Sequence, residues 1–428
     1  MRDACFSRRA AVIILLLAGL GQGLFAATRA AGPQADASGA AAPSVDSWAG
    51  DIDALVLELP RRHINLFAKI PEAEFLAAAA SLKASLPASS QEEILAGVMK
   101  LIASIGDSHT ALGYWPRRLF PLMVYWYDDG LWIRNTLPEY REILNCRITA
   151  VEGRSIEDVI PALADLIPHE NDSQVRGLLP GLLADPSLLH GLKVIPRPGA
   201  ARFTVRDAAG VERTADLRAA SFSGQPAWIE DPNAADSGLL YLKNRRQDYW
   251  FEILGGSATL YFQYNSCRET PGRPFAAFVG GMFAVAEEAG ANRVVVDLRL
   301  NGGGKSEVFR PFIDALKSRP AFNRRGNVFV LIGRRTFSSA LMNAVDLKKE
   351  TAAILAGEPT GGKPNHFGEI QRFRLPGSGL FVSYSTKYFK QVDGDPASLE
   401  PEVRVAVNFA DHRSSRDPVL EAVLALNR

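Results

Sequence analysis

Two short apolar stretches between positions 293 and 368 constrain the fold most strongly. Val294–Leu300 and Val328–Ile332 are rich in β-branched residues, which predicts buried strands. The first stretch leads into three consecutive glycines and the second into a turn that contains Ser338, and a helical pattern follows each. In an open α/β sheet, the groups that bind or react lie beyond the carboxyl ends of the strands. The sequence therefore predicts a glycine loop and a serine turn at one edge of one sheet.

Length, charge and cysteine content narrow the class of protein. The chain has 428 residues, so two or three domains are expected, and 47% of its residues are apolar, enough for sizeable cores. A formal net charge of +1 does not indicate a nucleic-acid partner or an anionic surface. Beyond the N-terminal segment the cysteines are Cys146 and Cys267, which could form a disulfide or remain as free buried thiols. No C-x-x-C pair points to a metal or redox motif.

The N-terminus has the composition of an export signal. Arg8 and Arg9 precede the apolar run Ala10–Leu20, and small residues follow it. Glycines interrupt the apolar character beyond this run, whereas a membrane span needs about 20 apolar residues. We therefore expect a signal peptide at 1–31 and a flexible leader at 32–49. The mature protein would be periplasmic or secreted, with membrane contact only through an uncleaved signal.

The pattern of apolar residues divides the rest of the chain into four segments. Residues 50–115 are helical in pattern, and the clearest helix, Glu92–Ile105, has a possible capping box of Ser89 and Glu92 and a stop at Gly106. Residues 116–220 predict a compact middle domain rich in strands and turns, and residues 221–257 a linker. Residues 258–428 alternate strand and helix and predict an α/β core.

Ser338 is the candidate nucleophile. A serine at a strand-to-helix turn exposes its hydroxyl beside free N–H groups, although a plain helix-capping serine would occupy the same position. A nucleophilic serine needs a base, and His109 lies in a polar loop between a predicted helix and a predicted strand. Lys363, in a glycine-rich loop, is an alternative base because a desolvated lysine can deprotonate a serine. His366 follows shortly after and could contact the substrate.

The glycine loop at positions 302–304 offers backbone N–H groups. Consecutive glycines allow a path that turns these groups into a cleft, where they can stabilise an oxyanion, although a plain tight turn is the alternative. The sequence Gly304-Lys305-Ser306 is also similar to the end of a nucleotide-binding phosphate loop. Arg299 stands where that motif requires glycine, which argues against a nucleotide-dependent enzyme.

Taken together, these motifs resemble the tail-specific (C-terminal processing) serine peptidases. Their order and spacing match over roughly residues 258–426, and a further match lies upstream. The matching segments are Gly106–Thr110, Asp297–Gly304, Thr336–Ala340, Gly357–Lys363, Leu399–Glu402 and Asp417–Leu420. The resemblance implies an α/β fold with a crotonase/Clp-protease-like catalytic core, a helical N-terminal domain and peptide or polypeptide substrates. It implies no cofactor and no metal, and it leaves the oligomeric state open.

The resemblance also implies a role for each site residue. One branch of the family uses a Ser–Lys dyad, which would make Lys363 the base. The other is similar to the tricorn core protease and has an adjacent Ser-His pair like Ser108-His109, which is the more specific match here. An acid would then orient the histidine. The candidates for the acid are Asp395 and Glu400, and those for the oxyanion hole are the N–H groups of Gly302 or Gly303 and of Ser339. Leu341 departs from the glutamate that the family usually has three residues after the nucleophile.

The middle segment resembles a PDZ-like module over Cys146–Val159. Such modules add a peptide strand to an exposed sheet edge, although the usual carboxylate-binding loop is not evident here. The alternative to a peptidase is a non-catalytic ligand- or peptide-binding protein on the same scaffold.

Overall fold

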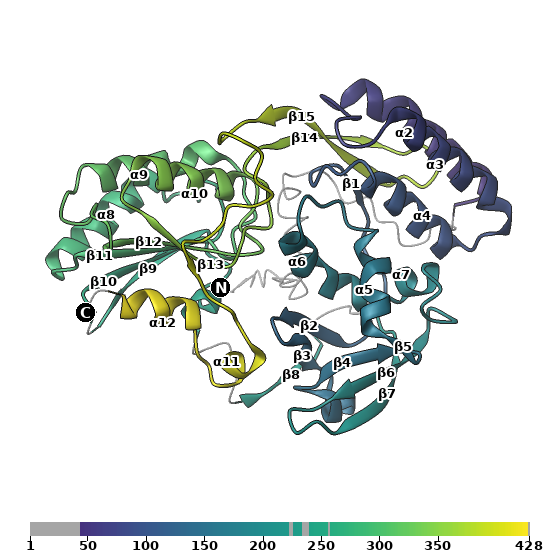
Figure 1. The fold of residues 1–428 in the computed structure, drawn as a ribbon, viewed down its shortest axis with the longest axis horizontal. Coiled ribbons are helices and arrows are strands. Elements are labelled where there is room, and N and C mark those ends of the chain that lie inside the picture. The colour runs from purple at the N-terminus through teal and green to yellow at the C-terminus, as the bar shows by residue number, and fades with distance from the viewer. Residues whose placement is uncertain (1–42, 222–225, 233–238, 256, 427–428) are drawn as a thin grey trace, which may run out of the picture.

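The computed structural model describes residues 43–221, 226–232, 239–255 and 257–426, and these form two halves (Figure 1). One half holds the α/β core, and the other holds a helical domain and a middle domain. The expected signal peptide, 1–31, lies outside the described residues, so export stays a prediction. None of the described helices is long and apolar enough to cross a membrane.

The helical domain opens the described chain. Its helices are α2 (Val45–Arg62), α3 (Glu72–Ser85), the 3-10 turn η2 (Leu86–Ala88) and α4 (Gln91–Ala103). Helix α2 starts inside the stretch expected to be a flexible leader. The capping box of α4 is formed by Ser90 and Glu93, one residue later than expected, because the hydroxyl of Ser89 instead donates to the carbonyl of Ser85 at 2.9 Å. Gly106 ends this segment with a φ of +72°, a conformation that glycine adopts without strain.

The middle domain is built on a mainly antiparallel sheet with strand order β2-β3-β4-β6-β7. Its elements are β2 (Leu122–Tyr127), β3 (Gly130–Thr136), η3 (Pro138–Ile143), β4 (Arg147–Val151), β5 (Arg154–Ser155), α5 (Ile156–Ala164), α6 (Asp172–Leu183), α7 (Pro186–Gly191), β6 (Ala200–Arg206), β7 (Glu212–Arg218) and β8 (Ile229–Glu230). Helices α5 and α6 pack on this sheet through apolar residues such as Val159 and Leu179. Helices α6 and α7 were not expected, and α6 positions part of the candidate site.

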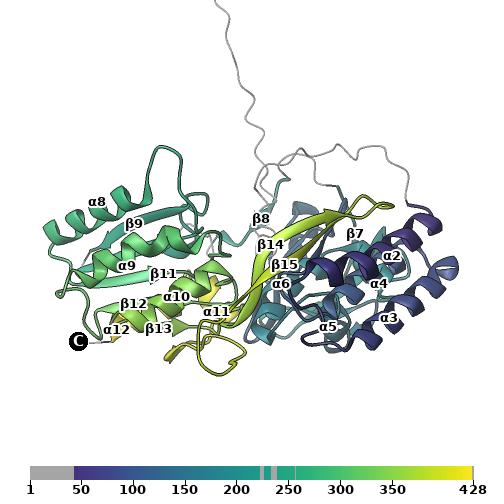
Figure 2. The same cartoon turned by 90° about the horizontal axis from the view of Figure 1, so that it is seen from above.

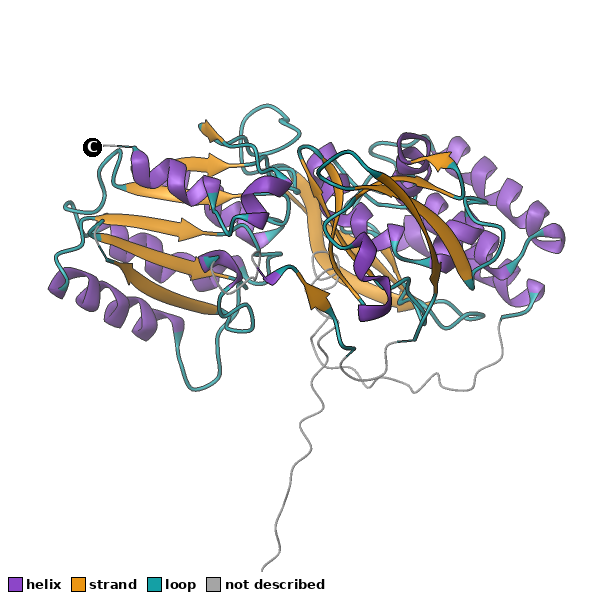
Figure 3. Cartoon of the chain, turned by 90° about the horizontal axis from the view of Figure 1, so that it is seen from below, coloured by secondary structure: helices purple, strands orange, loops and turns teal. Residues whose placement is uncertain are grey.

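The core is a six-stranded sheet with order β16-β13-β12-β11-β10-β9, in which β9 alone is antiparallel. Its elements are η6 (Leu240–Leu242), β9 (Tyr249–Leu254), β10 (Thr259–Tyr264), α8 (Phe275–Glu288), β11 (Arg293–Asp297), η7 (Ser306–Phe309), α9 (Arg310–Lys317), β12 (Val328–Ile332), α10 (Ser339–Glu350), β13 (Ile354–Gly357), β16 (Val403–Arg404), α11 (Phe409–Arg413) and α12 (Pro418–Ala425). Helices α8, α9 and α10 cover one face and α12 the other, and Figure 3 shows the strands side by side. Strand β9 lies in the segment expected to be a linker.

A long hairpin joins the two halves (Figures 1 and 2). Its strands are β14 (His366–Arg374) and β15 (Phe381–Phe389), and β15 pairs with the short strand β1 (Ala111–Gly113) of the helical domain. Val382 and Tyr384 pack into the apolar centre of that domain. Residues expected to belong to the core alone therefore also build the helical domain.

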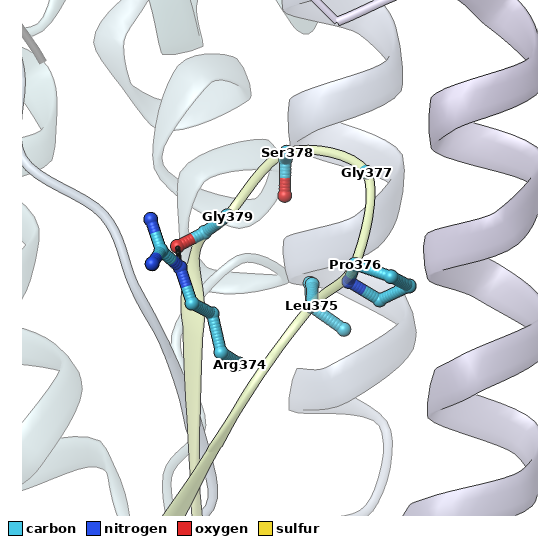
Figure 4. Close-up of a pocket in the computed structure, with 6 residues that line it drawn as sticks. All are labelled: Arg374, Leu375, Pro376, Gly377, Ser378 and Gly379. Carbon is cyan, nitrogen blue, oxygen red and sulfur yellow. Dashed lines mark hydrogen bonds between the residues drawn. The ribbon is translucent and has the colours of Figure 1, made fainter.

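The tip of this hairpin is anchored on helix α2. The buried carboxylate of Asp51 accepts the N–H groups of Gly377 and Ser378 at 2.6 Å and 2.8 Å. The tip residues Arg374–Gly379 line a small surface pocket, in which Arg374 donates to the carbonyl of Gly379 at 3.0 Å (Figure 4). This pocket is formed by the turn of the hairpin itself.

Candidate active site

Ser338 occupies a strained turn between β12 and α10. Its φ of 52° and ψ of −127° lie outside the regions that a non-glycine residue readily adopts. The side chain of Ser338 makes no capping hydrogen bond, although the residue stands at the N-cap position of α10. Ser338 is only partly buried. The plain capping role is therefore not realised, and the turn instead presents an uncommitted hydroxyl.

The glycine loop after β11 packs directly against this turn. Strands β11 and β12 are parallel neighbours, so their carboxyl ends meet at one edge of the sheet. A Cβ atom on Gly303 would lie 2.8 Å from the Cβ of Ser338 and 3.1 Å from the nitrogen of Ser339. The φ of Gly303 is +107°, so a side chain there would be disfavoured by conformation as well as by space. The loop and the serine turn thus converge as the sequence predicts.

Two backbone N–H groups remain available beside the hydroxyl. The N–H of Gly303 donates to the side-chain oxygen of Asn301 at 2.9 Å, so it is not free to bind an oxyanion. No hydrogen bond to another described residue occupies the N–H of Gly302 or of Ser339. Of the expected donors, Gly302 and Ser339 therefore remain as candidates, and Gly303 provides the close approach.

The loop that carries His109 is fixed by the buried carboxylate of Asp107. One oxygen accepts the backbone N–H of His109 at 3.0 Å, and the other contacts Nε2 of His63 at 3.0 Å and accepts the Ser385 hydroxyl at 2.7 Å. Burial opposes the charge of Asp107, but the hydrogen bond from His63 and the nearby His109 and Thr110 lower its pKa to about 2. The Asp107 carboxylate therefore connects the loop that carries His109 to the end of helix α2 and to strand β15.

The imidazole of His109 lies between two aromatic rings. It stacks on Phe337 with ring centroids 4.5 Å apart and on His366 with centroids 5.3 Å apart. Burial, with His366 alongside, lowers the pKa of His109 to about 3, so the ring is neutral at pH 7. Its Nε2 atom is buried and has no hydrogen-bond partner. Since Phe337 precedes Ser338, the stack places the imidazole beside the nucleophile turn. No hydrogen bond joins the two residues yet, and catalytic contacts commonly tighten only when substrate binds.

Ser108 connects His109 to an acid that the sequence did not suggest. The Ser108 hydroxyl lies 3.3 Å from Nδ1 of His109 and donates to Oε2 of Glu170 at 2.9 Å. The Glu170 side chain is 1% exposed and forms an ion pair with Lys69 at 3.0 Å. Burial raises the pKa of Glu170, whereas Lys69 favours its charged form. Glu170 lies just before α6, in a stretch with no recognisable motif.

The two acids expected from the sequence make their contacts elsewhere. Asp395 pairs with Lys363, and Glu400 accepts the Ser398 hydroxyl at 2.5 Å and lies 3.7 Å from Arg404. Their side chains are 63% and 57% exposed, so both carboxylates face solvent. Neither contacts Ser108 or His109, whereas Glu170 accepts the Ser108 hydroxyl.

Lys363 and His366 also differ from their expected places. Lys363 forms an ion pair with Asp395, and no hydrogen bond joins it to Ser338. His366 was expected to contact substrate but is 3% exposed, and its Nδ1 lies 3.2 Å from the carbonyl of Pro364. It therefore forms the wall behind His109. Among the described residues, no cluster of three or more His, Cys, Asp or Glu side chains could hold a metal ion, and Cys146 and Cys267 are buried free thiols.

Comparison with solved structures identifies the fold. Mature CPAF in complex with lactacystin superposes with a TM-score of 0.61 at 13% identity, over 89% of this chain and 97% of that chain. The chain has the CPAF fold. A point mutant of CPAF gives a TM-score of 0.60 at 13% identity, over 90% of this chain and 99% of that one. The photosystem II D1 C-terminal processing protease reaches only 0.37 at 14% identity, over 89% and 96% of the two chains, which is too low to carry an argument.

The superposition on CPAF can be compared with the fold that the sequence motifs predict. This superposition confirms the expected mixed α/β fold with several sheets. At this level of identity the likeness establishes the fold alone. No family model and no curated protein matches the chain. The PDZ-like character of the middle domain and the crotonase-like character of the core stay predictions.

Proposed function

We propose that this protein is a serine peptidase in which Ser338 attacks a peptide carbonyl and His109 is the general base. One observation carries the proposal. A buried, neutral imidazole with a free Nε2 stacks on the residue next to a strained and uncapped serine. A nucleophilic hydroxyl needs a base of this kind within reach.

The hydrogen bonds of Ser108 support a specific tautomer of His109. A carboxylate only accepts, so the single proton of the Ser108 hydroxyl is donated to Glu170. The Ser108 oxygen must then accept from Nδ1 of His109, which places the imidazole proton on Nδ1. Nε2 keeps its lone pair and can take the proton of Ser338. Glu170 thus orients the base through Ser108, as the acid of a catalytic triad does directly.

Acylation of Ser338 then follows in two proton transfers, and a water deprotonated by the same imidazole afterwards hydrolyses the acyl-enzyme and restores the Ser338 hydroxyl. Nε2 of His109 takes the proton of Ser338 as its oxygen attacks the carbonyl, and later gives it to the leaving amine. The free N–H groups of Gly302 and Ser339 are placed to bind the oxyanion that forms meanwhile. Loss of one such donor costs about 3 kcal/mol of transition-state stabilisation.

We further propose that the substrate is an extended polypeptide and that the protein is exported. The substrate class is supported by the tail-specific motifs together with the CPAF fold. Export is supported by the arginines and the apolar run at the N-terminus.

The proposal is tested with Ser338→Ala. This variant is expected to abolish hydrolysis of an unstructured protein such as casein while the melting temperature changes little, because the hydroxyl makes no structural hydrogen bond. Ser318→Ala is a matched control, since its hydroxyl makes only local contacts after helix α9, donating to the Ala315 carbonyl at 2.9 Å and accepting from Arg319 at 3.3 Å. Wild-type activity in Ser338→Ala would refute the assignment. Lactacystin, which forms a complex with mature CPAF, is a second probe of the same site.

A further inference from the structure

Asn171 connects the middle domain to the core at the candidate site. As the N-cap of α6, its side-chain oxygen accepts the N–H of Gln174 at 2.9 Å. Its side-chain nitrogen points to the opposite side, within hydrogen-bond distance of three carbonyls. These belong to Thr360 at 3.1 Å, Gly362 at 3.4 Å and Ala397 at 2.8 Å. One amide therefore begins a helix of the middle domain and holds two loops of the core.

On the side of the middle domain, Asn171 fixes the acid of the relay. Glu170 is its immediate neighbour in the chain, and the N–H of Glu170 donates to the side chain of Gln174 at 3.2 Å. Gln174 is itself 4% exposed. The turn from Glu170 to Gln174 is thereby closed by two hydrogen bonds, and it aims the carboxylate of Glu170 at Ser108.

On the side of the core, the side-chain amide of Asn171 holds the loop that contains Thr360 and Gly362. This loop packs against the turn that carries Ser338. A Cβ atom on Gly362 would lie 3.0 Å from the ring of Phe337 and 3.2 Å from the side chain of Leu341, so this loop supports both ends of the Ser338 turn. A Cβ on Gly361 would lie 1.9 Å from the carbonyl oxygen of Arg334, which leaves no room for the loop to shift toward β12. A displacement of the loop would therefore move Phe337, the ring on which His109 stacks.

We propose that Asn171 is a positioning residue that sets the alignment of the two parts of the catalytic machinery. One part is the relay of Glu170, Ser108 and His109, and the other is the nucleophile turn with Ser338. The inference rests on the proposed function. It accounts for how a base and a nucleophile from different halves of the molecule are kept in register although no hydrogen bond joins them.

Two substitutions separate this role from helix capping. Asn171→Asp keeps an N-cap oxygen for Gln174 but places a carboxylate against three carbonyl oxygens, so attraction becomes repulsion. Asn171→Ser keeps a capping oxygen and removes the amide donors without adding charge. Asn408→Asp is the matched control, because Asn408 is also a helix N-cap and its side chain makes no such contacts to the opposite half.

The experiment measures kcat, KM and melting temperature for these variants with a peptide substrate. We expect Asn171→Asp and Asn171→Ser to lower kcat by about 10-fold or more, since a displacement of about 1 Å at a reacting centre can cost 100-fold. KM should change much less, Asn408→Asp should resemble the wild type, and helix content should be kept. A kcat like that of the wild type in both Asn171 variants would overturn the inference. A fall in kcat explained entirely by unfolding at the assay temperature would do the same.

A second measurement keeps the inference separate from the proposed function. Hydrogen exchange followed by mass spectrometry needs no activity. In Asn171→Asp we expect faster exchange both in residues 359–363 and in the loop that carries His109, compared with the wild type and Asn408→Asp. Unchanged exchange in either segment would show that Asn171 does not couple them, whether or not the protein hydrolyses peptides. An inactive wild type with the expected exchange would instead refute the peptidase proposal alone.

Discussion

The neutrality of His109 is the property on which the chemistry depends at the scale of single residues. A histidine in solution is half protonated near pH 6.5, and a protonated ring cannot accept the proton of Ser338. Burial between Phe337 and His366 shifts the pKa down to about 3, so the base stays available over the whole physiological range. Glu170 is shifted in the opposite direction, because burial raises the pKa of a carboxyl group.

These opposite shifts predict an unusual pH dependence of kcat/KM. His109 should produce no loss of activity near its ordinary value of 6.5, because its folded pKa is lowered. As the pH falls, the first loss should come from protonation of Glu170, at a pH above the ordinary value of 4.5. A protonated Glu170 no longer has to accept the proton of the Ser108 hydroxyl. The hydrogen bonds of Ser108 then no longer keep the imidazole proton of His109 on Nδ1. Glu170→Gln, which cannot titrate, should lower the plateau and lose this acid limb.

The pH profile of the free enzyme checks this expectation, since kcat/KM reports groups of the unliganded protein. A limb centred near 6.5 in both the wild type and Glu170→Gln would contradict it. That result would show that His109 titrates as an exposed histidine.

The sequence indicated the proposed nucleophile and base more readily than the residues that support them. Ser338 and His109 stand in motifs, at a strand end and in a short polar loop. Glu170 has no local signal, and its contact with Ser108 joins positions 62 residues apart through the packing of α6. Asp395 and Glu400 fit the family pattern by position, but side-chain pairing with Lys363 and Ser398 decided their surroundings.

At the scale of elements, the site depends on a glycine loop that touches the nucleophile turn. We predict that Gly303→Ala abolishes activity and destabilises the fold, because it combines a φ of +107° with a contact of 2.8 Å to the Cβ of Ser338. Gly153→Ala is the control for backbone strain alone, since Gly153 has a φ of +74° and nothing within 4 Å of an added Cβ. Strain of this kind costs about 1–2 kcal/mol.

Thermal unfolding and peptide hydrolysis of both glycine variants separate the two effects. Gly153→Ala should lose stability and keep its activity at a permissive temperature. Gly303→Ala should lose more stability and remain inactive at any temperature at which it is folded. Activity in folded Gly303→Ala would show that the loop does not constrain Ser338.

Elements with strong local patterns were predictable, and those set by distant packing were not. Val328–Ile332 was expected as a strand and is β12 residue for residue. Its five apolar side chains are all buried, as is typical of a central strand in a parallel sheet. Helix α6 was missed because Gly177 and Pro180 lower its intrinsic helix propensity, and burial of Leu179 and Leu183 overrides that weakness. The sequence did not indicate strand β9, because this strand is defined by its antiparallel pairing with β10.

At the scale of the whole molecule, the candidate site is assembled from all parts of the fold. The core supplies Ser338, the helical domain supplies His109, and the segment before α6 supplies Glu170. The β14–β15 hairpin ties these parts together, since it leaves the core, pairs with β1 and is held at its tip by Asp51 (Figure 1). Such a return of the chain across two halves leaves no trace in local sequence patterns, which is why the domain boundaries could not be drawn from them.

The assembly of a base and a nucleophile from different halves is tested most directly by covalent labelling. A fluorophosphonate reacts only with an activated serine, and intact mass followed by peptide mapping locates the adduct. The account predicts one adduct, on Ser338, which is lost in His109→Gln and kept in Lys363→Met. An adduct on another serine, no adduct at all, or labelling that survives loss of His109 but not of Lys363 would contradict it.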